Sequence, residues 1–136
     1  MDKSVLRFLL NFLVFGLCSS TGFATEITDD SPQRVEQKRA DVSGAPGTEV
    51  IASMAEYKPG ESIDSHRHHG IEVGHVVQGA AVQIPGKEPV NLPTGITLMN
   101  LRDVLHGGFT VVGDTSLKLF TVHVVDKGKP LYDYSR

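Results

Sequence analysis

Apolar residues from Thr48 onward fall into short runs, and Gly, Pro, Asn and Asp separate one run from the next. No segment beyond the N-terminus has sustained helical periodicity. Many short strands at regular spacing are typical of a small antiparallel barrel or sandwich, so we expect an all-β fold. The expected strands are 49–57, a strand around His66, 71–77, 80–84 (paired back on 71–77), 89–92, 96–100, 105–112 and 116–125.

The N-terminus has the pattern of a secretory signal. Lys3 and Arg7 precede an almost purely apolar stretch over 8–17, and Gly22-Phe23-Ala24 places small residues where a signal peptidase acts. The apolar run is too short to span about 30 Å of hydrocarbon as an anchor. We therefore expect residues 1–24 to be a signal peptide, the mature protein to be periplasmic or secreted, and no membrane association after cleavage.

The remaining chain is expected to form one small domain, given a total length of 136 residues. Residues 25–44 are polar and are expected to be a flexible leader, with an edge strand or dimer arm at 35–42 as an alternative. Residues 45–130 carry the strand pattern and are expected to form the barrel, and 131–136 a C-terminal tail.

Cysteine usage and net charge narrow the function classes. Cys18 is the only cysteine and lies in the segment expected to be removed, so the mature chain is expected to have no disulfide and to depend on its core or a bound metal. The net charge of −3 becomes −4 without residues 1–24, and acidic and basic residues are intermixed. This charge pattern gives no reason to expect binding to nucleic acid or to an anionic membrane.

A cluster of metal-ligating residue types lies between Gly60 and Gly79. Its order is Gly, five residues, His66, one residue, His68, three residues, Glu72, six residues, Gly. Two histidines one residue apart on a strand project from the same face. If the chain turns at 69–70 and returns antiparallel, Glu72 faces the imidazoles, and this mixed nitrogen and oxygen set suits divalent first-row metals.

This spacing resembles the first signature of the cupin superfamily, with a match at every signature position. The second cupin signature is Gly, five residues, Pro, one residue, Gly, two residues, His, three residues, Asn. Starting at Gly95 it places His106 at the histidine position. Leu101, Asp103 and Thr110 stand at the Pro, Gly and Asn positions, so the histidine is retained and the turn residues are not.

The resemblance covers roughly residues 45–128 and implies a double-stranded β-helix, or jelly-roll barrel, of cupin type. It also implies a metal site formed by His66, His68, Glu72 and His106. Mn, Fe, Ni, Co, Cu and Zn are all compatible with such ligands. A five- or six-coordinate ion would keep open positions for water, dioxygen or a substrate oxygen. The altered turn leaves open whether His106 completes the site.

The other histidines have simpler interpretations. His69 and His75 are expected to point away from the site, because strand side chains alternate. His123 is interpreted either as a satisfied, partly buried histidine or as a base at the barrel mouth behind the ligands. Arg102 and Asp103 are expected to lie on a surface loop.

Two functions follow, from different classes. One is a metal-dependent enzyme acting on a small oxygen-rich molecule, and the resemblance implies dioxygenase, decarboxylase, isomerase or lyase chemistry. The alternative is a non-catalytic module that binds or senses a small molecule or a metal. A barrel with an empty site is a third interpretation. A homodimer is an expectation from the family alone.

Overall fold

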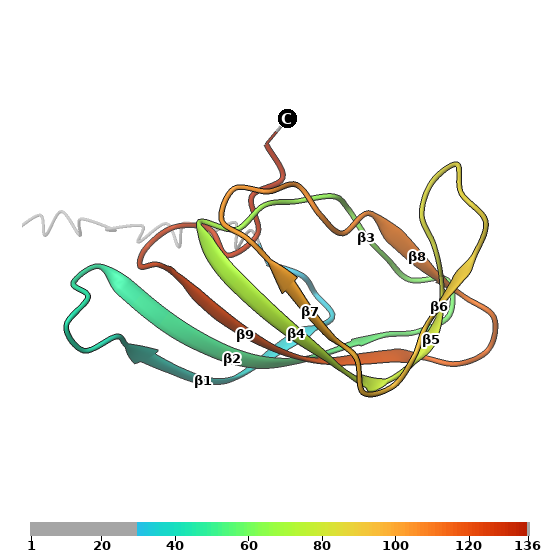
Figure 1. Cartoon of the computed structure of the whole chain (residues 1–136), viewed down its shortest axis with the longest axis horizontal. Coiled ribbons are helices and arrows are strands. Elements are labelled where there is room, and N and C mark those ends of the chain that lie inside the picture. The colour runs from blue at the N-terminus through green and yellow to red at the C-terminus, as the bar shows by residue number, and fades with distance from the viewer. Residues whose placement is uncertain (1–29, 136) are drawn as a thin grey trace, which may run out of the picture.

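The computed structural model describes residues 30–135, and every regular element in this range is a β-strand. Within this range no helix is long and apolar enough to cross a membrane. The expected signal peptide, residues 1–24, lies outside the described residues. The strands, shown in Figure 1, are β1 (Arg34–Asp41), β2 (Thr48–Tyr57), β3 (Ser62–Ile63), β4 (Gly70–Gln78), β5 (Ala80–Gln83), β6 (Val90–Leu92), β7 (Thr97–Asn100), β8 (Phe109–Val112) and β9 (Leu117–Asp126).

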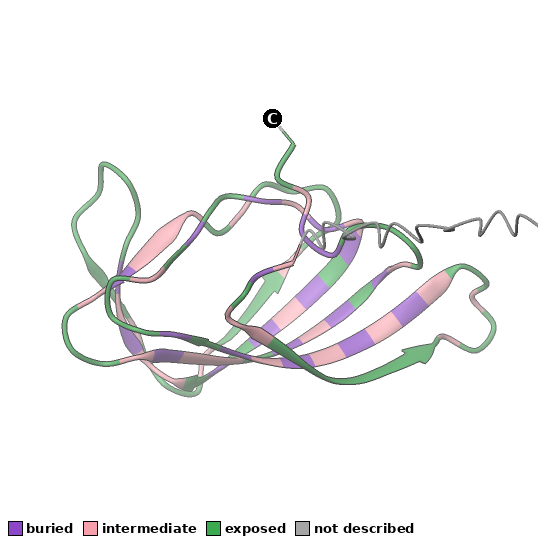
Figure 2. Cartoon of the chain, turned by 180° about the vertical axis from the view of Figure 1, so that it is seen from behind, coloured by how far each residue is buried: buried purple, intermediate pink, exposed green. Residues whose placement is uncertain are grey.

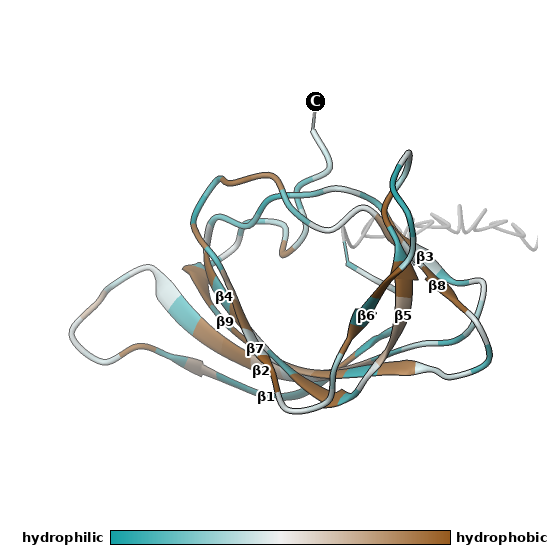
Figure 3. Cartoon of the chain, turned by 45° about the vertical axis from the view of Figure 1, so that its right-hand side comes forward, coloured by the Kyte–Doolittle hydropathy of each residue, from teal (hydrophilic) through white to brown (hydrophobic). Residues whose placement is uncertain are grey.

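The strands form two antiparallel sheets that face each other (Figure 3). One sheet has the order β1-β2-β9-β4-β7, and the other has the order β3-β8-β5-β6. From β2 to β9 the chain passes repeatedly from one sheet to the other, which is the course of a double-stranded β-helix. The expected all-β fold is confirmed.

The expected pairing of 80–84 on 71–77 is wrong. β5 pairs with β6 and β8, whereas β4 pairs with β7 and β9. The chain changes sheets at Gly79, where an added Cβ would lie 2.3 Å from the Leu92 carbonyl oxygen. Only glycine permits this close approach, so the residue marks a corner rather than a hairpin turn.

Burial alternates from residue to residue along β2, β4 and β9 of the five-stranded sheet (Figure 2), so their side chains point in turn to the barrel interior and to the outer surface. The inward positions of β2, β4 and β9 include Ile51, Val76 and Leu117, each no more than 1% exposed. The same alternation also turns polar residues inward, among them Glu72 and His123. The register that builds the core therefore also places the candidate site.

β1 occupies part of the segment expected to be a flexible leader. It pairs antiparallel with β2 from the Arg34–Ala55 pair to the Asp41–Glu49 pair. The edge strand considered as an alternative is therefore the form that the chain takes here. Only Arg34 of β1 is not exposed. Charged side chains along the strand pair with charged partners, which helps to explain how so polar a segment can be ordered.

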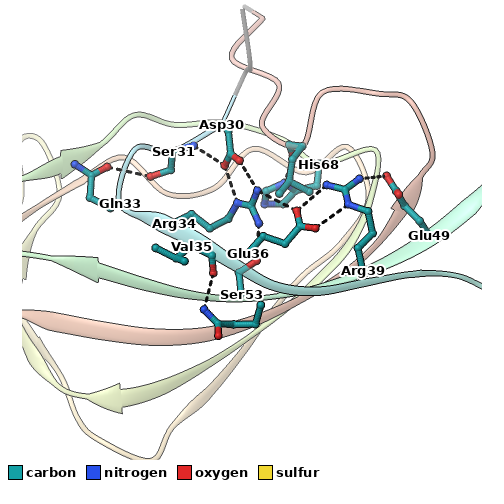
Figure 4. A network of polar contacts seen from close by, with 12 residues as sticks. Asp30, Ser31, Gln33, Arg34, Val35, Glu36, Arg39, Glu49, Ser53 and His68 are labelled. Carbon is teal, nitrogen blue, oxygen red and sulfur yellow. Dashed lines mark hydrogen bonds and ion pairs between the residues drawn. The ribbon is translucent and has the colours of Figure 1, made fainter. Parts of the chain in front are cut away.

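Arg34 is the central residue of this polar network (Figure 4). Its side chain is 5% exposed and pairs with the Asp30 carboxylate. Its Nη1 donates to the Ser53 hydroxyl oxygen at 2.6 Å, and its Nε donates to Asp30 Oδ1 at 2.7 Å. These charge-assisted hydrogen bonds join the start of β1 to the middle of β2.

Arg34→Ala is expected to lower the free energy of unfolding by about 2 kcal/mol, the usual cost of losing buried hydrogen bonds to a charged group. Urea unfolding followed by circular dichroism would measure the loss, since the chain has no tryptophan. Lys127→Ala is the control, because Lys127 makes an exposed pair with Asp41 at the other end of β1. An equal effect of the two variants would contradict the assignment.

Candidate metal centre

Two loop segments, rather than a regular strand, carry His66 and His106. Each donates its backbone N–H to the other's carbonyl, at 2.9 and 3.0 Å, as an isolated bridge. The expected strand around His66, paired with 71–77, is therefore wrong. The segment is extended all the same, so His66 and His68 still turn to one side.

The altered turn before His106 keeps a glycine-like backbone. Asp103 stands where the second cupin signature has glycine, and it adopts φ 60°, in the left-handed region. Asp tolerates this region better than most residues. The Asp103 N–H also donates to the His68 carbonyl at 3.1 Å, which joins the two histidine-bearing segments.

Glu72 lies on β4 between two inward-facing polar neighbours. It is directly opposite His123 of β9 and Asn100 of β7. The Asn100 amide donates to Glu72 Oε2 at 2.6 Å. His68 Nε2 and His106 Nε2 lie 3.3 Å from this same oxygen, and His123 Nε2 lies 3.4 Å from Oε1. The glutamate is thus the point on which the imidazoles converge.

All four residues predicted as ligands come together, and a fifth joins them. His66, His68 and His106 form one group whose potential ligand atoms lie within 4.8 Å of one another, and His68, Glu72 and His123 form a second. The imidazole centroids of His66 and His106 are 4.4 Å apart, and those of His68 and His123 are 4.6 Å apart. His68 belongs to both groups and is fully buried.

Backbone carbonyls fix the orientation of three imidazoles. Nδ1 of His66 is 2.8 Å from the Asp64 carbonyl oxygen, Nδ1 of His68 is 2.5 Å from that of Leu131, and Nδ1 of His106 is 2.9 Å from that of Val104. A carbonyl only accepts, so each Nδ1 carries the proton. The neutral form of each ring then has its lone pair on Nε2, which is the arrangement typical of metal-bound histidine.

Several buried nitrogens at this point have no hydrogen-bond partner. They are Nε2 of His68 and His106 and both ring nitrogens of His123. Buried polar atoms are almost always paired, and an unpaired one costs about 1–3 kcal/mol. Neutral imidazoles would direct lone pairs at the Glu72 carboxylate, which is repulsive. A cation between them removes both costs, so the residues present fit a divalent metal ion.

The pKa shifts in the cluster arise from burial and from the contacts between Glu72 and the imidazoles. Burial acts to raise the pKa of Glu72, but contacts from His106, His123 and His68 outweigh it and hold the pKa below its usual range. Burial lowers the pKa of His66 to about 4. Burial also lowers the pKa of His123. For His106 burial acts in the same direction, but Glu72 and the Val104 carbonyl outweigh it and raise the pKa.

The segment expected to be a C-terminal tail is part of the site. Leu131 and Tyr132 are 8% and 3% exposed. The Tyr132 ring lies against His66 and His68, with centroid distances of 4.7 and 5.1 Å. Residues 67 and 133 also pair through their backbones. These contacts close one end of the histidine cluster, and the expectation of a tail did not include them.

The remaining candidates lie outside the cluster, as expected. His75 is exposed, and its Nδ1 lies 3.1 Å from the Thr97 hydroxyl oxygen. His69 is half-buried and lies 3.7 Å from carboxylate oxygens of both Asp103 and Asp133. Arg102 is exposed and pairs with Asp126 at 2.8 Å.

The interpretation of His123 as a partly buried, satisfied histidine is wrong, because the residue is fully buried and its ring nitrogens are unpaired. Its position opposite Glu72 depends on the pairing of β4 with β9. Only the register between β4 and β9 identifies His123 as a neighbour of Glu72.

A cavity of about 210 Å³ opens beside the cluster, between the two sheets. His66, Glu72, His106 and Tyr132 line one end of it. His68 and His123 are fully buried and do not line it. A molecule in the cavity would therefore meet only one side of the cluster.

Comparison with solved structures finds similar folds at low sequence identity. The polyketide cyclase RemF from Streptomyces resistomycificus matches with TM-score 0.50 and 17% identity, over 73% of this chain and 80% of that chain. An RmlC-like cupin with a double-stranded β-helix fold from Methanocaldococcus jannaschii matches with TM-score 0.48 and 14% identity, over 71% and 84%. The DMSP lyase DddQ from Ruegeria pomeroyi DSS-3 matches with TM-score 0.47 and 17% identity, over 59% and 40%.

This chain thus spans only 40% of the length of the lyase. No family model and no curated protein matches the sequence. At these identities the likeness concerns the fold alone, and for that the RemF match is sufficient. Only the residues of this chain bear on the chemistry of its site.

Proposed function

We propose that this chain, which has the cupin fold that its sequence indicates, binds a divalent transition metal at the histidine–glutamate cluster. His66, His68, Glu72 and His106 are the proposed ligands, and the metal is one of Mn, Fe, Ni, Co, Cu and Zn. The observation that carries the proposal is the set of unpaired Nε2 atoms beside the Glu72 carboxylate. Without a cation or an extra proton, that arrangement is electrostatically unfavourable.

Each group around the cluster has a separate task. The carbonyls of residues 64, 104 and 131 hold the three imidazoles in the tautomer that presents Nε2. Asn100 holds Glu72 through Oε2. Tyr132 excludes water from one side of the histidines, and burial raises its pKa, so its phenol stays neutral. A bound metal would supply Lewis-acid polarisation of a coordinated oxygen.

Two functions are proposed for such a site, a metal-dependent enzyme and a non-catalytic binding module. The enzyme proposal rests on a cavity that reaches the cluster, where a small oxygen-bearing molecule could approach the metal. The binding-module proposal rests on the shortage of acid–base groups beyond the ligands, since the rest of the cavity wall is mainly apolar. We favour a metal-dependent enzyme of dioxygenase, decarboxylase, isomerase or lyase type.

Elemental analysis of the purified protein is the first test, and close to one equivalent of a transition metal per chain is expected. Dioxygen uptake and product analysis on a panel of phenols, diketones and small carboxylates would then separate the two proposals. Turnover of any panel member supports the enzyme. Tight binding without turnover in fully loaded protein supports the binding module, and absence of metal from protein supplied with all six ions overturns both.

Export to the periplasm or medium and assembly as a homodimer are further proposals. The first is supported by the sequence pattern of residues 1–24. The second has some support from apolar side chains on the outer face of the five-stranded sheet, where Ile71, Phe120 and Val124 are each about 40% exposed. Fractionation of expressing cells and light scattering would test them separately.

A further inference from the structure

The interior of the barrel changes from polar to apolar along its length. On β4 the inward residues run from Glu72 through Gly74 to Val76, and on β7 they run from Asn100 to Leu98. The four-stranded sheet closes the apolar part from the other side. The apolar lining residues include Ile63, Val82, Leu92, Phe109 and Leu119.

Gly74 lies where the polar part meets the apolar part, and its missing side chain leaves space. An added Cβ would meet only Thr121 Cγ2, at 4.0 Å. In contrast, a Cβ on Gly70 or Gly79 would lie within 2.3 Å of a backbone oxygen. Backbone packing therefore requires glycine at those two positions and not at Gly74. A glycine inside a strand weakens it and often marks the place where a ligand approaches closely.

Thr121 points to the same place from the neighbouring strand. It is directly opposite Gly74, lines the cavity and is 3% exposed. Its hydroxyl oxygen is buried and has no hydrogen-bond partner. The Thr121 atom nearest an added Gly74 Cβ is its methyl carbon Cγ2, at 4.0 Å, so Thr121 adds apolar surface beside Gly74.

The volume limits the size of that ligand. The cavity of about 210 Å³ exceeds by one small substituent the roughly 150 Å³ cavity that accommodates a benzene molecule. The rings of Tyr57 and Phe109 line it and meet edge to face, with centroids 5.6 Å apart. Aromatic walls of this kind favour a further ring placed edge-on or offset. A polyol would leave most of its hydroxyl groups against apolar side chains.

We propose that the cavity takes a monocyclic aromatic molecule with one oxygen substituent, its ring over Gly74 and its oxygen toward the histidine–glutamate cluster. A hydroxyl suits this position because it can donate toward Glu72, which lines the cavity. This proposal names the substrate class of the proposed function, and it rests on that function only for the metal near the ligand's oxygen. The apolar part of the cavity favours an aromatic ring whether or not an ion is bound.

Calorimetry with phenol and with myo-inositol, a ring of equal size but uniformly polar, is the test, carried out on metal-loaded and chelated protein. Phenol is expected to bind and myo-inositol not to bind. Gly74→Leu should fill the cavity and weaken phenol binding roughly tenfold or more. Gly74→Ala is a milder variant that the structure accommodates, and a smaller loss is expected. Val77→Leu on the same strand enlarges an exposed residue and should change nothing.

Toluene separates the contribution of the ligand's hydroxyl from that of its ring. It should bind more weakly than phenol to wild-type protein, because only phenol has an oxygen to place toward the cluster. Tighter binding of myo-inositol than of phenol, no binding of phenol at all, or phenol binding that Gly74→Leu and Gly74→Ala leave unaltered would each overturn the proposal. Elemental analysis of every variant keeps the two proposals distinct. Phenol binding by protein that takes up none of the six ions would refute the metal centre and leave the aromatic pocket intact, whereas metal uptake without phenol binding would refute only the aromatic pocket.

Discussion

His68→Ala is expected to reduce bound metal to a small fraction of the wild-type stoichiometry. His68 is the one residue shared by both groups of potential ligands, and its unpaired Nε2 lies 3.3 Å from Glu72 Oε2. Loss of a directly bound ligand should exceed the roughly 10–100-fold loss of affinity typical of outer positioning residues. Elemental analysis after dialysis against a metal buffer would measure it.

Three further variants define the ligand set. His106→Ala should also lose the metal, because its Nε2 faces the same Glu72 oxygen, and its partly exposed side chain makes misfolding a lesser concern. His123→Ala should keep the stoichiometry, because His123 faces the other oxygen and no carbonyl fixes its tautomer. His75→Ala is the matched control, an exposed histidine on β4. Full metal content in folded His68→Ala would refute the site.

The sequence spacing of His66, His68, Glu72 and His106 predicted that these four side chains would come together, and the structure places them in one cluster. It succeeded because an extended chain turns alternate side chains to one side even without a regular ladder, as at His66 and His68. The turn before His106 forms without the glycine of the signature, because Asp103 adopts a left-handed backbone at that position. Local geometry, which a sequence encodes directly, was therefore predictable.

What the sequence did not reveal depends on contacts between distant segments. His123 joins the cluster through the pairing of β4 with β9, and nothing in either strand alone fixes that register. Tyr132 packs on the histidines because the segment after β9 folds back over them, although residues 131–136 were expected to form only a tail. Arg34 orders β1 through partners on β2 that become neighbours only after folding. In each case burial rather than local propensity decides the structure.

Removal of the metal is expected to lower the melting temperature by about 10 °C or more. An ion that binds only the native state at 1,000 times its dissociation constant adds about 4 kcal/mol. Each kcal/mol corresponds to roughly 4–8 °C for a domain near this size. In this protein the loss also leaves the Nε2 atoms of His68 and His106 unpaired beside a carboxylate. Thermal unfolding with and without chelator, at verified metal content, measures the difference.

The pH dependence of this stabilisation and the His68→Ala variant test whether the ion is held by the histidine–glutamate cluster. Metal ligands must be unprotonated, so the stabilisation by metal should shrink as the pH falls through the pKa of His106, which Glu72 and the Val104 carbonyl raise above the usual 6.5. His66, whose pKa burial lowers to about 4, should add to the loss only in more acidic solution. His68→Ala should melt at one temperature whether or not chelator is present, whereas His75→Ala should keep the wild-type difference. A melting temperature that stays constant after complete removal of the ion would mean that the cluster does not hold it in the folded state. The unpaired imidazoles would then need a proton, rather than a metal, as their partner.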